Sequence, residues 1–337
     1  MSNTSKGNVA RAHHYIPQFY LAGFTSSGSK KGALYVHDLK QIKGWLSNPV
    51  DAGHQKDFYR INLPGISPDE IEKVLGLIET PASEVIKEIA AKNSLPSGKN
   101  FGVLMQFIVL MTVRIPRLRE IQAKFEEEWA RQFIRLYSEI PSEQLASDIE
   151  KYRRENPDSQ LTIEQFKEFV ESDEYNVRVT QDGYMKALVA GLANVPILAS
   201  VLGQRTWNLI VADSGAGEFV CTDDPVTLDW MIEVPPFYQS SPGFGMLGTV
   251  VHMPLTRYHA LVGNFDDSGN IKVPHGVTLS AHKNMVALFN LIVTKRATRF
   301  VYSTKPDFVW KKADRTIGNK DDFLAAVKEA QSSKDAA

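Results

Sequence analysis

The order in which hydrophobic patterns follow one another along the chain constrains its fold more than any single motif does. Short stretches with strand character come first, at residues 34–37, 44–46 and 58–61, with a loop at 51–55. A long helical region follows them and ends with an apolar helix expected at residues 183–203. A β-rich region comes last, with strands expected at residues 206–212, 218–222, 249–255, 259–263 and 298–302. The first two of these should form a hairpin, and a short helix is expected at residues 320–330. Segregated helices and strands favour an α+β fold over an alternating α/β fold. We therefore predict short N-terminal strands, a central helical block and a C-terminal block of mostly antiparallel β-sheet.

The helical block is marked by its apolar periodicity and its prolines. The window Phe101–Val113 is the most apolar part of the chain. It is too short to cross a bilayer, so we expect a buried core helix there. Pro116 should end or bend that helix close to Arg114. The stretch beyond it is amphipathic, with large apolar residues at helical spacing: Ile121, Phe125, Trp129, Phe133 and Leu136.

The charge pattern suggests how the chain is divided. Residues 142–174 mix Lys, Arg and Glu and lack a large apolar face, so we expect an exposed helical insertion there, with a helix-capping signal at Thr162 to Gln165. The two ends of the chain, residues 1–10 and 331–337, are small and polar and are predicted to be flexible tails. We predict a single α+β domain over residues 11–310 that carries this insertion.

Composition excludes several classes of protein. The 38 basic and 39 acidic residues nearly cancel, so the chain as a whole has no net attraction to nucleic acid or to an anionic membrane. A single cysteine, Cys221, excludes an intramolecular disulfide framework. The first ten residues lack the apolar core of a secretory signal. These features predict a soluble, cytoplasmic protein without a membrane segment.

The stretch from Arg11 to Phe24 combines two adjacent histidines, a proline and several large apolar residues. Pro17 restricts the backbone around it, and Phe19, Leu21 and Phe24 can anchor the segment in a core. Side chains of adjacent residues in extended backbone point to opposite sides, so His13 and His14 should face different surroundings. Each histidine is either a hydrogen-bonded structural residue or a general base or metal ligand.

This stretch resembles the opening of an uncharacterised, mostly bacterial family, domain of unknown function 4238. Members of that family begin with His-His-Tyr-Val/Ile-Pro-Gln-Phe-Tyr-Leu. Later motifs of this chain are similar to those of the family, in the same order, between residues 13 and 302: Ile78-Glu79, Arg114-Ile115-Pro116, Phe219 to Val226, Pro254-Leu255 and Asn290. Asp224 departs from the asparagine that the family more often carries. The resemblance supplies no established activity.

Four kinds of polar residue at the ends of elements are the candidates for chemistry. Glu79 ends an apolar helical face, and Glu72 lies one heptad earlier on nearly the same face. Arg114 follows a buried helix and requires a carboxylate or a phosphate as a partner. Asp223 and Asp224 follow a strand directly, as carboxylates of phosphoester enzymes often do, although Asp-Asp-Pro is also a good turn sequence. The predicted catalytic residues are His13, His14, Glu79, Arg114 and Asp223.

The leading hypothesis from the sequence is a metal-dependent phosphodiesterase or nuclease. His14, Glu79, Asp223 and Asp224 would hold Mg²⁺ or Mn²⁺, and Arg114 would bind a phosphate of a nucleic acid or another phosphoester. The bacterial resemblance implies a role in defence or toxicity. Two alternatives remain open. One is a non-enzymatic binding or sensor module that contacts a protein through the aromatic loop 233–248, and the other is a hydrolase that needs no metal.

Overall fold

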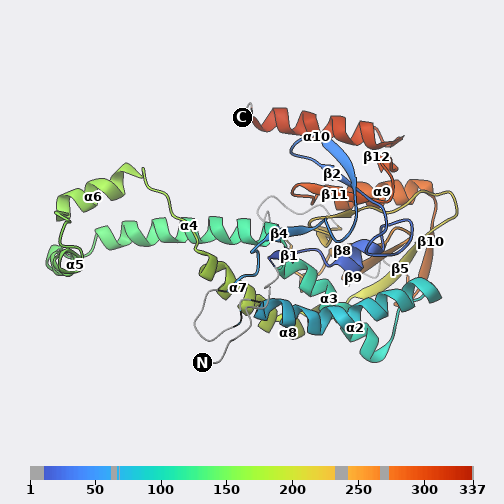
Figure 1. Ribbon diagram of the computed structural model, residues 1–337, viewed down its shortest axis with the longest axis horizontal. Helices are drawn as coiled ribbons and strands as arrows, with labels where there is room; N and C mark the ends of the chain where they lie inside the picture. Colours follow the sequence, from blue (N-terminus) through green and yellow to red (C-terminus); the bar gives the residue numbers. More distant parts are fainter. Residues whose placement is uncertain (1–10, 62–66, 68, 232–241, 266–272, 336–337) are drawn as a thin grey trace, which may run out of the picture. The chain divides into compact units, whose positions relative to one another are not determined.

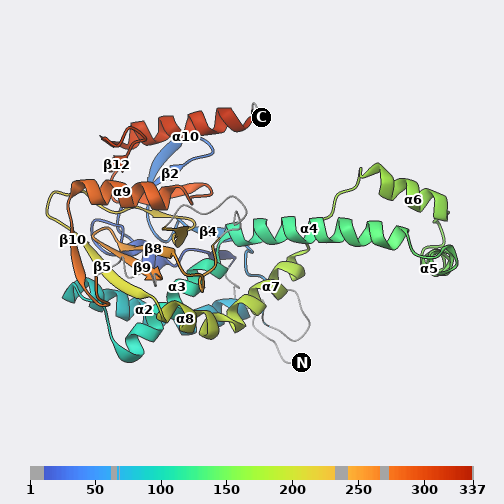
Figure 2. The ribbon, with the colours of Figure 1, turned by 180° about the vertical axis from the view of Figure 1, so that it is seen from behind.

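The computed structural model describes residues 11–61, 67, 69–231, 242–265 and 273–335 (Figures 1 and 2). The chain divides into two compact units. Unit 1 is built from residues 1–117 and 187–337, and unit 2 is residues 118–186. The predicted insertion at 142–174 lies inside unit 2. The fold is α+β, as the segregation of helical and strand patterns predicts.

Unit 1 opens with short antiparallel strands. Strand β1 (Ala12–His14) pairs with β4 (His54–Lys56), and the helix α1 (Gln18–Ala22) follows β1. Strand β2 (Leu34–Asp38) pairs with β3 (Lys43–Ser47), as expected for the first two strand-like stretches. A third strand was expected at residues 58–61, but the strand β4 forms earlier, at residues that read as a loop. Residues 54–56 form a strand because they pair with β1, and their composition alone does not indicate a strand.

Three helices pack together in unit 1. They are α2 (Glu70–Lys92), α3 (Gly98–Val113) and α8 (Val195–Gly203). Pro81 stays inside α2 and does not end it. Helix α3 ends before Pro116, as expected, and seven of its apolar residues are buried. Residues 183–203, expected as one helix, form α7 (Gln181–Ala193) and α8 with a bend of 45° between them. Pro196 in the first turn of α8 explains the break.

A five-stranded sheet forms the centre of unit 1. Its strand order is β10-β5-β9-β8-β7. The members are β5 (Thr206–Ala212), β7 (Thr227–Trp230), β8 (Thr249–Thr256), β9 (His259–Phe265) and β10 (Thr278–Ala281). Only β10 runs parallel to its neighbour, so the sheet is mostly antiparallel. In Figure 1, α2, α3 and α8 lie on one side of β5, β8 and β9, and α9 and α10 lie on the other.

A hairpin was expected between residues 206–212 and 218–222, and the structure does not form it. Strand β6 (Cys221–Thr222) instead belongs to a four-stranded sheet with the order β3-β2-β11-β6, where β11 is Phe300–Ser303. Strand β5 has β9 and β10 as its neighbours. The loop between them therefore connects two sheets. Pairing with strands that lie far away in sequence determines this, and local turn propensity does not.

The C-terminal part covers the second sheet. Helix α9 (Lys283–Thr294) packs on β6, β8 and β12, and its apolar face joins a core that includes Phe219, Phe289 and Trp310. The short strands β12 (Trp310–Lys311) and β13 (Ile317–Gly318) pair with each other. Helix α10 (Lys320–Asp335) extends five residues beyond the expected end at residue 330. Gln331 holds its last turn, because its side chain donates to the carbonyl of Leu39 at 2.8 Å.

Unit 2 is helical. It contains α4 (Pro116–Ser138) from residue 118 onward, α5 (Ser142–Glu155), α6 (Ile163–Ser172) and the first part of α7. The expected capping signal at Thr162 is present as a full capping box with Gln165. Across the described residues no single helix has the length and apolarity to cross a membrane. Two bent pairs of helices, α3 with α4 and α7 with α8, have that length and apolarity when each pair is taken together.

Candidate functional site

The two N-terminal histidines have different environments, as their alternating directions on β1 predict. His13 is buried, and its Nδ1 accepts a hydrogen bond from the backbone N–H of Tyr59 at 2.6 Å. Its ring stacks on the ring of Tyr59 at 5.9 Å with an angle of 11°. His13 therefore ties the segment after β4 to β1. Of the two roles considered for it, the contacts favour the structural one.

His14 lies on the other side of the strand and is only partly buried. Its Nε2 is 2.9 Å from the carbonyl oxygen of Val50. A carbonyl only accepts, so the proton of the neutral ring is on Nε2 and the lone pair is on Nδ1. Burial lowers the pKa of His14, and the hydrogen bond to Val50 opposes that shift. The charges of His54 and Arg114 lower the pKa further, and the charge of Glu79 raises it. His14 is thus a neutral imidazole at neutral pH, with one nitrogen able to take a proton.

A third histidine stands directly opposite His14. The register of β1 and β4 pairs His14 with His54, and the ring centroids are 5.1 Å apart with an angle of 58°. His54 is exposed. The amide of Gln18 lies 3.4 Å from both nitrogens of the His14 ring, which limits how that ring can rotate. Two imidazoles, one partly buried and one in water, therefore share one surface.

Arg114 supports the backbone of His14. Its side chain is 1% exposed and forms an ion pair with Glu79. It also donates to the backbone carbonyl of His14 and, at 3.4 Å from Nε, to the hydroxyl of Tyr59. Every nitrogen of the guanidinium therefore has a protein partner. Arg114 fixes the backbone of His14, and a phosphate would have to displace these partners in order to bind.

Glu72 adds a carboxyl group that lacks a partner. It lies two helical turns before Glu79 on α2, and the charges of Arg114 and Glu79 both reach it. Its Oε1 is buried and has no hydrogen-bond partner. Burial raises the pKa of Glu72 to about 7, although the positive charge of Arg114 opposes the shift. Groups with such shifts gather at functional sites.

Asp223 belongs to a different set of contacts. It is buried, and its carboxylate accepts backbone N–H bonds from Thr298 at 2.8 Å, Arg299 at 2.8 Å and Phe300 at 3.0 Å. Burial raises the pKa of Asp223 to about 6 against the opposing effect of these three donors. Asp223 fixes the start of β11.

We call His14, His54, Glu72, Glu79 and Arg114 the histidine site. Asp224, like Asp223, contacts residues outside it. It lies 3.4 Å from Nη1 of Arg117 and 3.7 Å from Nε of Arg296. Burial raises the pKa of Asp224 to about 6, although these two arginines lower it. In the described part of the chain, no three His, Cys, Asp or Glu side chains are grouped as a metal site requires. The expected donors His14, Glu79, Asp223 and Asp224 are divided between two sets of contacts.

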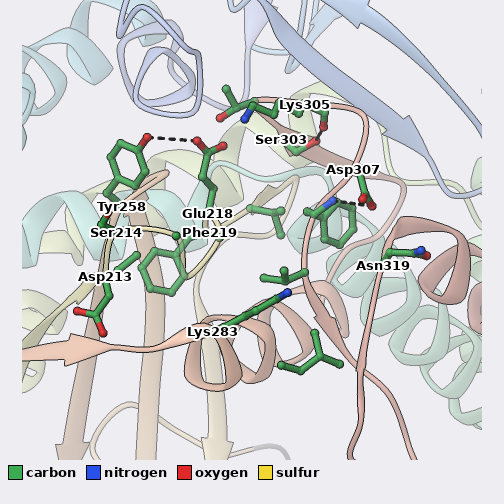
Figure 3. Close-up of a pocket in the computed structure, with 18 of the residues that line it drawn as sticks. Asp213, Ser214, Glu218, Phe219, Tyr258, Lys283, Ser303, Lys305, Asp307 and Asn319 are labelled. Atoms are coloured by element: carbon green, nitrogen blue, oxygen red, sulfur yellow. Dashed lines mark hydrogen bonds between the residues drawn. The ribbon is translucent and has the colours of Figure 1, made fainter.

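A cavity of about 890 Å³ lies elsewhere in unit 1 (Figure 3). Its polar lining includes Asp213, Glu218, Lys283, Lys305 and Asp307, and Tyr258 contacts Glu218 across one wall. None of the residues predicted as catalytic lines it. The cavity is lined by both acidic and basic side chains, so its charge favours no single class of ligand.

The wall of this cavity contains a serine–histidine contact that is oriented against catalysis. Ser303 Oγ donates to the carbonyl of Lys305 at 2.7 Å, and His37 Nε2 lies 2.9 Å from the same Oγ. Because the Ser303 proton is already given to Lys305, the His37 ring donates to the serine oxygen. Burial lowers the pKa of His37 to about 4, so the ring is neutral. A nucleophilic serine needs the reverse direction, with its proton passing to histidine.

Sequence reasoning found part of the histidine site and missed part of it. His14, Glu79 and Arg114 were predicted and lie together, and Glu72 was noted as a neighbour of Glu79. His54 was missed because residues 51–55 read as a loop. Its only signal is the pairing of β1 with β4, which cannot be read from a single sequence. The aromatic loop proposed as a protein contact lies outside the described residues up to residue 241.

Comparisons with known proteins place the chain in a family without assigning an activity. A family model described as "Protein of unknown function (DUF4238)" matches residues 12–307. No curated protein matches, and no solved structure matches. The matched range contains β1, α2 and β4, and so every residue of the histidine site. The chain therefore belongs to the DUF4238 family.

Proposed function

We propose that this protein is a phosphodiesterase that cleaves RNA, with His14 and His54 transferring the protons. The observation that carries the proposal is the facing pair of imidazoles on β1 and β4, 5.1 Å apart. General acid–base catalysis at a phosphodiester requires one group to accept a proton and another to donate one. Histidine is the side chain best suited to both tasks near neutral pH.

The proposed reaction uses the 2′-hydroxyl of RNA as its nucleophile. Nδ1 of His14 takes the 2′-OH proton, and the 2′-oxygen bonds to the neighbouring phosphorus. The bond from phosphorus to the 5′-oxygen breaks, and His54 donates a proton to that oxygen. The products are a 2′,3′-cyclic phosphate and a free 5′-OH. The lowered pKa of His14 keeps it unprotonated and ready to act as the base.

The surroundings of the pair favour an anionic substrate. Lys56 is exposed in the register position opposite Ala12, two residues along β4 from His54. Arg11 and Arg60 contact Asp57 beside it. Two arginines thus pair with Asp57, and Lys56 adds a third cation close in sequence to His54. Such a local excess of positive charge attracts phosphates even though the whole chain is nearly neutral.

The metal-dependent scheme remains the rival within the same class of substrate. It requires His14, Glu79, Asp223 and Asp224 to meet around Mg²⁺ or Mn²⁺, and the contacts of the described residues divide these donors into two sets. The histidine pair needs no such meeting, so the geometry favours it. An activity on RNA also suits the expected role in bacterial defence or toxicity. The buried thiol of Cys221 suits work in the cytoplasm.

The test is cleavage of a labelled single-stranded RNA, with a DNA of the same sequence as a matched substrate and with EDTA in parallel. We expect cleavage of RNA alone, unaffected by EDTA, with cyclic phosphate ends. His14→Asn and His54→Asn should each slow cleavage by about 100-fold or more. His282→Asn, at an exposed histidine before α9, is the control and should leave the rate unchanged. Loss of activity in EDTA or equal cleavage of DNA would favour the metal scheme.

A binding module is the second candidate, and one observation favours it. The guanidinium of Arg114 is fully occupied by Glu79, Tyr59 and the carbonyl of His14, as in a purely structural network. In this case the protein would bind RNA without cleaving it. His54→Asn would then weaken binding, and no cyclic phosphate would form with any variant.

A further inference from the structure

Helix α4 presents its apolar side to solvent. From residue 118 onward it belongs to unit 2, and none of its residues is buried. Large side chains on one face are 53–65% exposed: Ile121, Phe125, Trp129, Phe133 and Leu136. We call these five residues the α4 stripe. Contiguous exposed apolar surface of this extent marks an interaction site on a soluble protein.

The other side of α4 is already in use within unit 2. There Arg131 bonds to Asp173 at 2.6 Å and to the carbonyl of Tyr175 at 2.7 Å. The chain thus packs its own polar segments against the polar face of α4. The apolar face is left uncovered, which is the reverse of the usual arrangement of a surface helix.

The aromatic residues of the α4 stripe are placed symmetrically about Trp129. Phe125 and Phe133 each lie four positions from Trp129, on opposite sides of it. An interface with a two-fold axis brings a surface against itself, so it must be complementary to itself. Reading α4 in reverse about Trp129 supplies that complementarity in the placement of its large apolar side chains.

We propose that the α4 stripe binds the α4 stripe of a second copy of this chain, with the two helices antiparallel and Trp129 at the two-fold axis. Phe125 of each copy then meets Phe133 of the other. Positions four residues apart form one of the ridges by which helices interlock. The proposal stands on unit 2 alone and does not depend on the proposed function.

A groove beside the α4 stripe gives the second copy a place to insert. A cavity of about 370 Å³ lies between Phe125 and Trp129 on one wall and Val177 and Val179 on the other. An aromatic ring of the second copy fits such an apolar groove. The exposed parts of the stripes of two copies come to roughly 1,000 Å², taking about 150–250 Å² for a whole aromatic side chain. That is about the smallest area that a specific interface buries.

The first test measures the mass of the full chain in solution by light scattering at about 5–100 μM, a range suited to affinities in the micromolar region. We expect a dimer for the wild type and a monomer for Trp129→Glu. Leu77→Glu is the control, because Leu77 is 77% exposed on α2 and lies outside the stripe. It should remain a dimer. Circular dichroism and a melting curve check that Trp129→Glu is folded. A monomeric wild type, or a dimer unaffected by Trp129→Glu, would overturn the proposal.

The second test fixes the register by oxidative cross-linking. Trp129→Cys lies at the axis and should form a disulfide-linked dimer, whereas Leu77→Cys should not. Phe125→Cys and Phe133→Cys should each cross-link poorly alone but well when the two variants are mixed. The native Cys221 is buried and does not interfere. Cross-linking of Phe125→Cys with itself in preference to the mixture would mean parallel helices and would overturn the antiparallel arrangement.

Discussion

At the scale of single residues, Glu72 is the group whose environment conflicts most with its chemistry. Its Oε1 is buried without a hydrogen-bond partner, and burial raises its pKa to about 7. A carboxyl group with a raised pKa is easier to bury protonated than ionised. The fold therefore carries a cost at neutral pH that it does not carry in mild acid.

Glu72→Gln should remove this cost. The folded-state pKa lies above the unfolded value of about 4.5, so the penalty is absent below that value, grows as the pH rises toward 7 and is constant above. We expect the variant to be more stable than the wild type by about 1–3 kcal/mol at pH 8 and to match it near pH 4.5. Urea denaturation at the two pH values measures this. An equal difference at both would contradict the assignment.

The sequence could predict residue types at this site but not their partners. The apolar run before Arg114 and the end of the α2 face at Glu79 were enough to single out both residues, and they form an ion pair. Alternation on a strand correctly separated His13 from His14. Nothing in a single sequence distinguishes a carboxylate aimed at backbone amides, as in Asp223, from one aimed at a metal or substrate. That distinction depends on residues 298–300, which are distant in sequence.

At the scale of elements, the ion pair of Arg114 and Glu79 joins three parts of unit 1. It links the end of α3 to α2 and, through the carbonyl of His14, to β1. The side chain of Arg114 is 1% exposed, so water does not stabilise its charge. Removing one partner of a buried pair leaves an uncompensated charge.

Glu79→Ala should therefore lower the free energy of unfolding by about 3 kcal/mol, at the lower end of the range for buried pairs because Glu79 is partly exposed. Glu84→Ala is a matched control on the same helix, since its pair with Lys87 is exposed to solvent. It should change stability little. Chemical denaturation of both variants decides, and equal effects would mean that the Arg114 pair contributes no more than a surface pair.

Asp223 plays a comparable part for β11. Asp223→Ala leaves three backbone N–H groups at residues 298–300 without their acceptor. We expect a loss of about 3–5 kcal/mol, since each stranded buried donor costs about 1–3 kcal/mol. Asp229→Ala, at an exposed position on β7, is the control. A melting curve that shows Asp223→Ala as stable as the wild type would return Asp223 to the list of catalytic candidates.

At the scale of the whole molecule, the chain leaves unit 1 once and returns to it once. Unit 2 accounts for residues 118–186, and the stretches on either side of it both belong to unit 1. Within unit 1, Gly191 approaches Val113 closely, since a Cβ on Gly191 would meet the Val113 side chain at 3.4 Å. The chain therefore leaves and re-enters unit 1 at neighbouring places.

Replacing residues 118–186 by a short Gly/Ser linker should leave unit 1 folded. The linker needs only to join two neighbouring ends, and loop closure over a few residues costs little. Far-ultraviolet circular dichroism with a single cooperative melt is the measurement. The shortened chain also lacks the α4 stripe, so it should be monomeric in light scattering. A shortened chain that is soluble but unfolded would contradict the independence of the two units.

The general architecture followed from the sequence, whereas the arrangement of its strands did not. Segregated patterns predicted the α+β fold, and the break expected near Pro116 is present, whereas the break before Pro196 was not expected. The hairpin expected at residues 206–222 failed because β5 and β6 pair with strands far away along the chain. Pairings of this kind depend on three-dimensional packing, and local propensity carries little information about them.

The placement of residues 15–25 has a consequence for how the protein is made. Tyr20 donates to the carbonyl of Pro254, and the carbonyl of Phe24 accepts from Thr304, 280 positions later. A ribosome adding about 5–20 residues per second needs on the order of 10–60 s to synthesise that interval. Throughout this time Tyr20 and Phe24, both buried in the finished fold, lack these two late contacts. The nascent chain thus offers a hydrophobic segment to chaperones from the beginning of its synthesis until nearly the end.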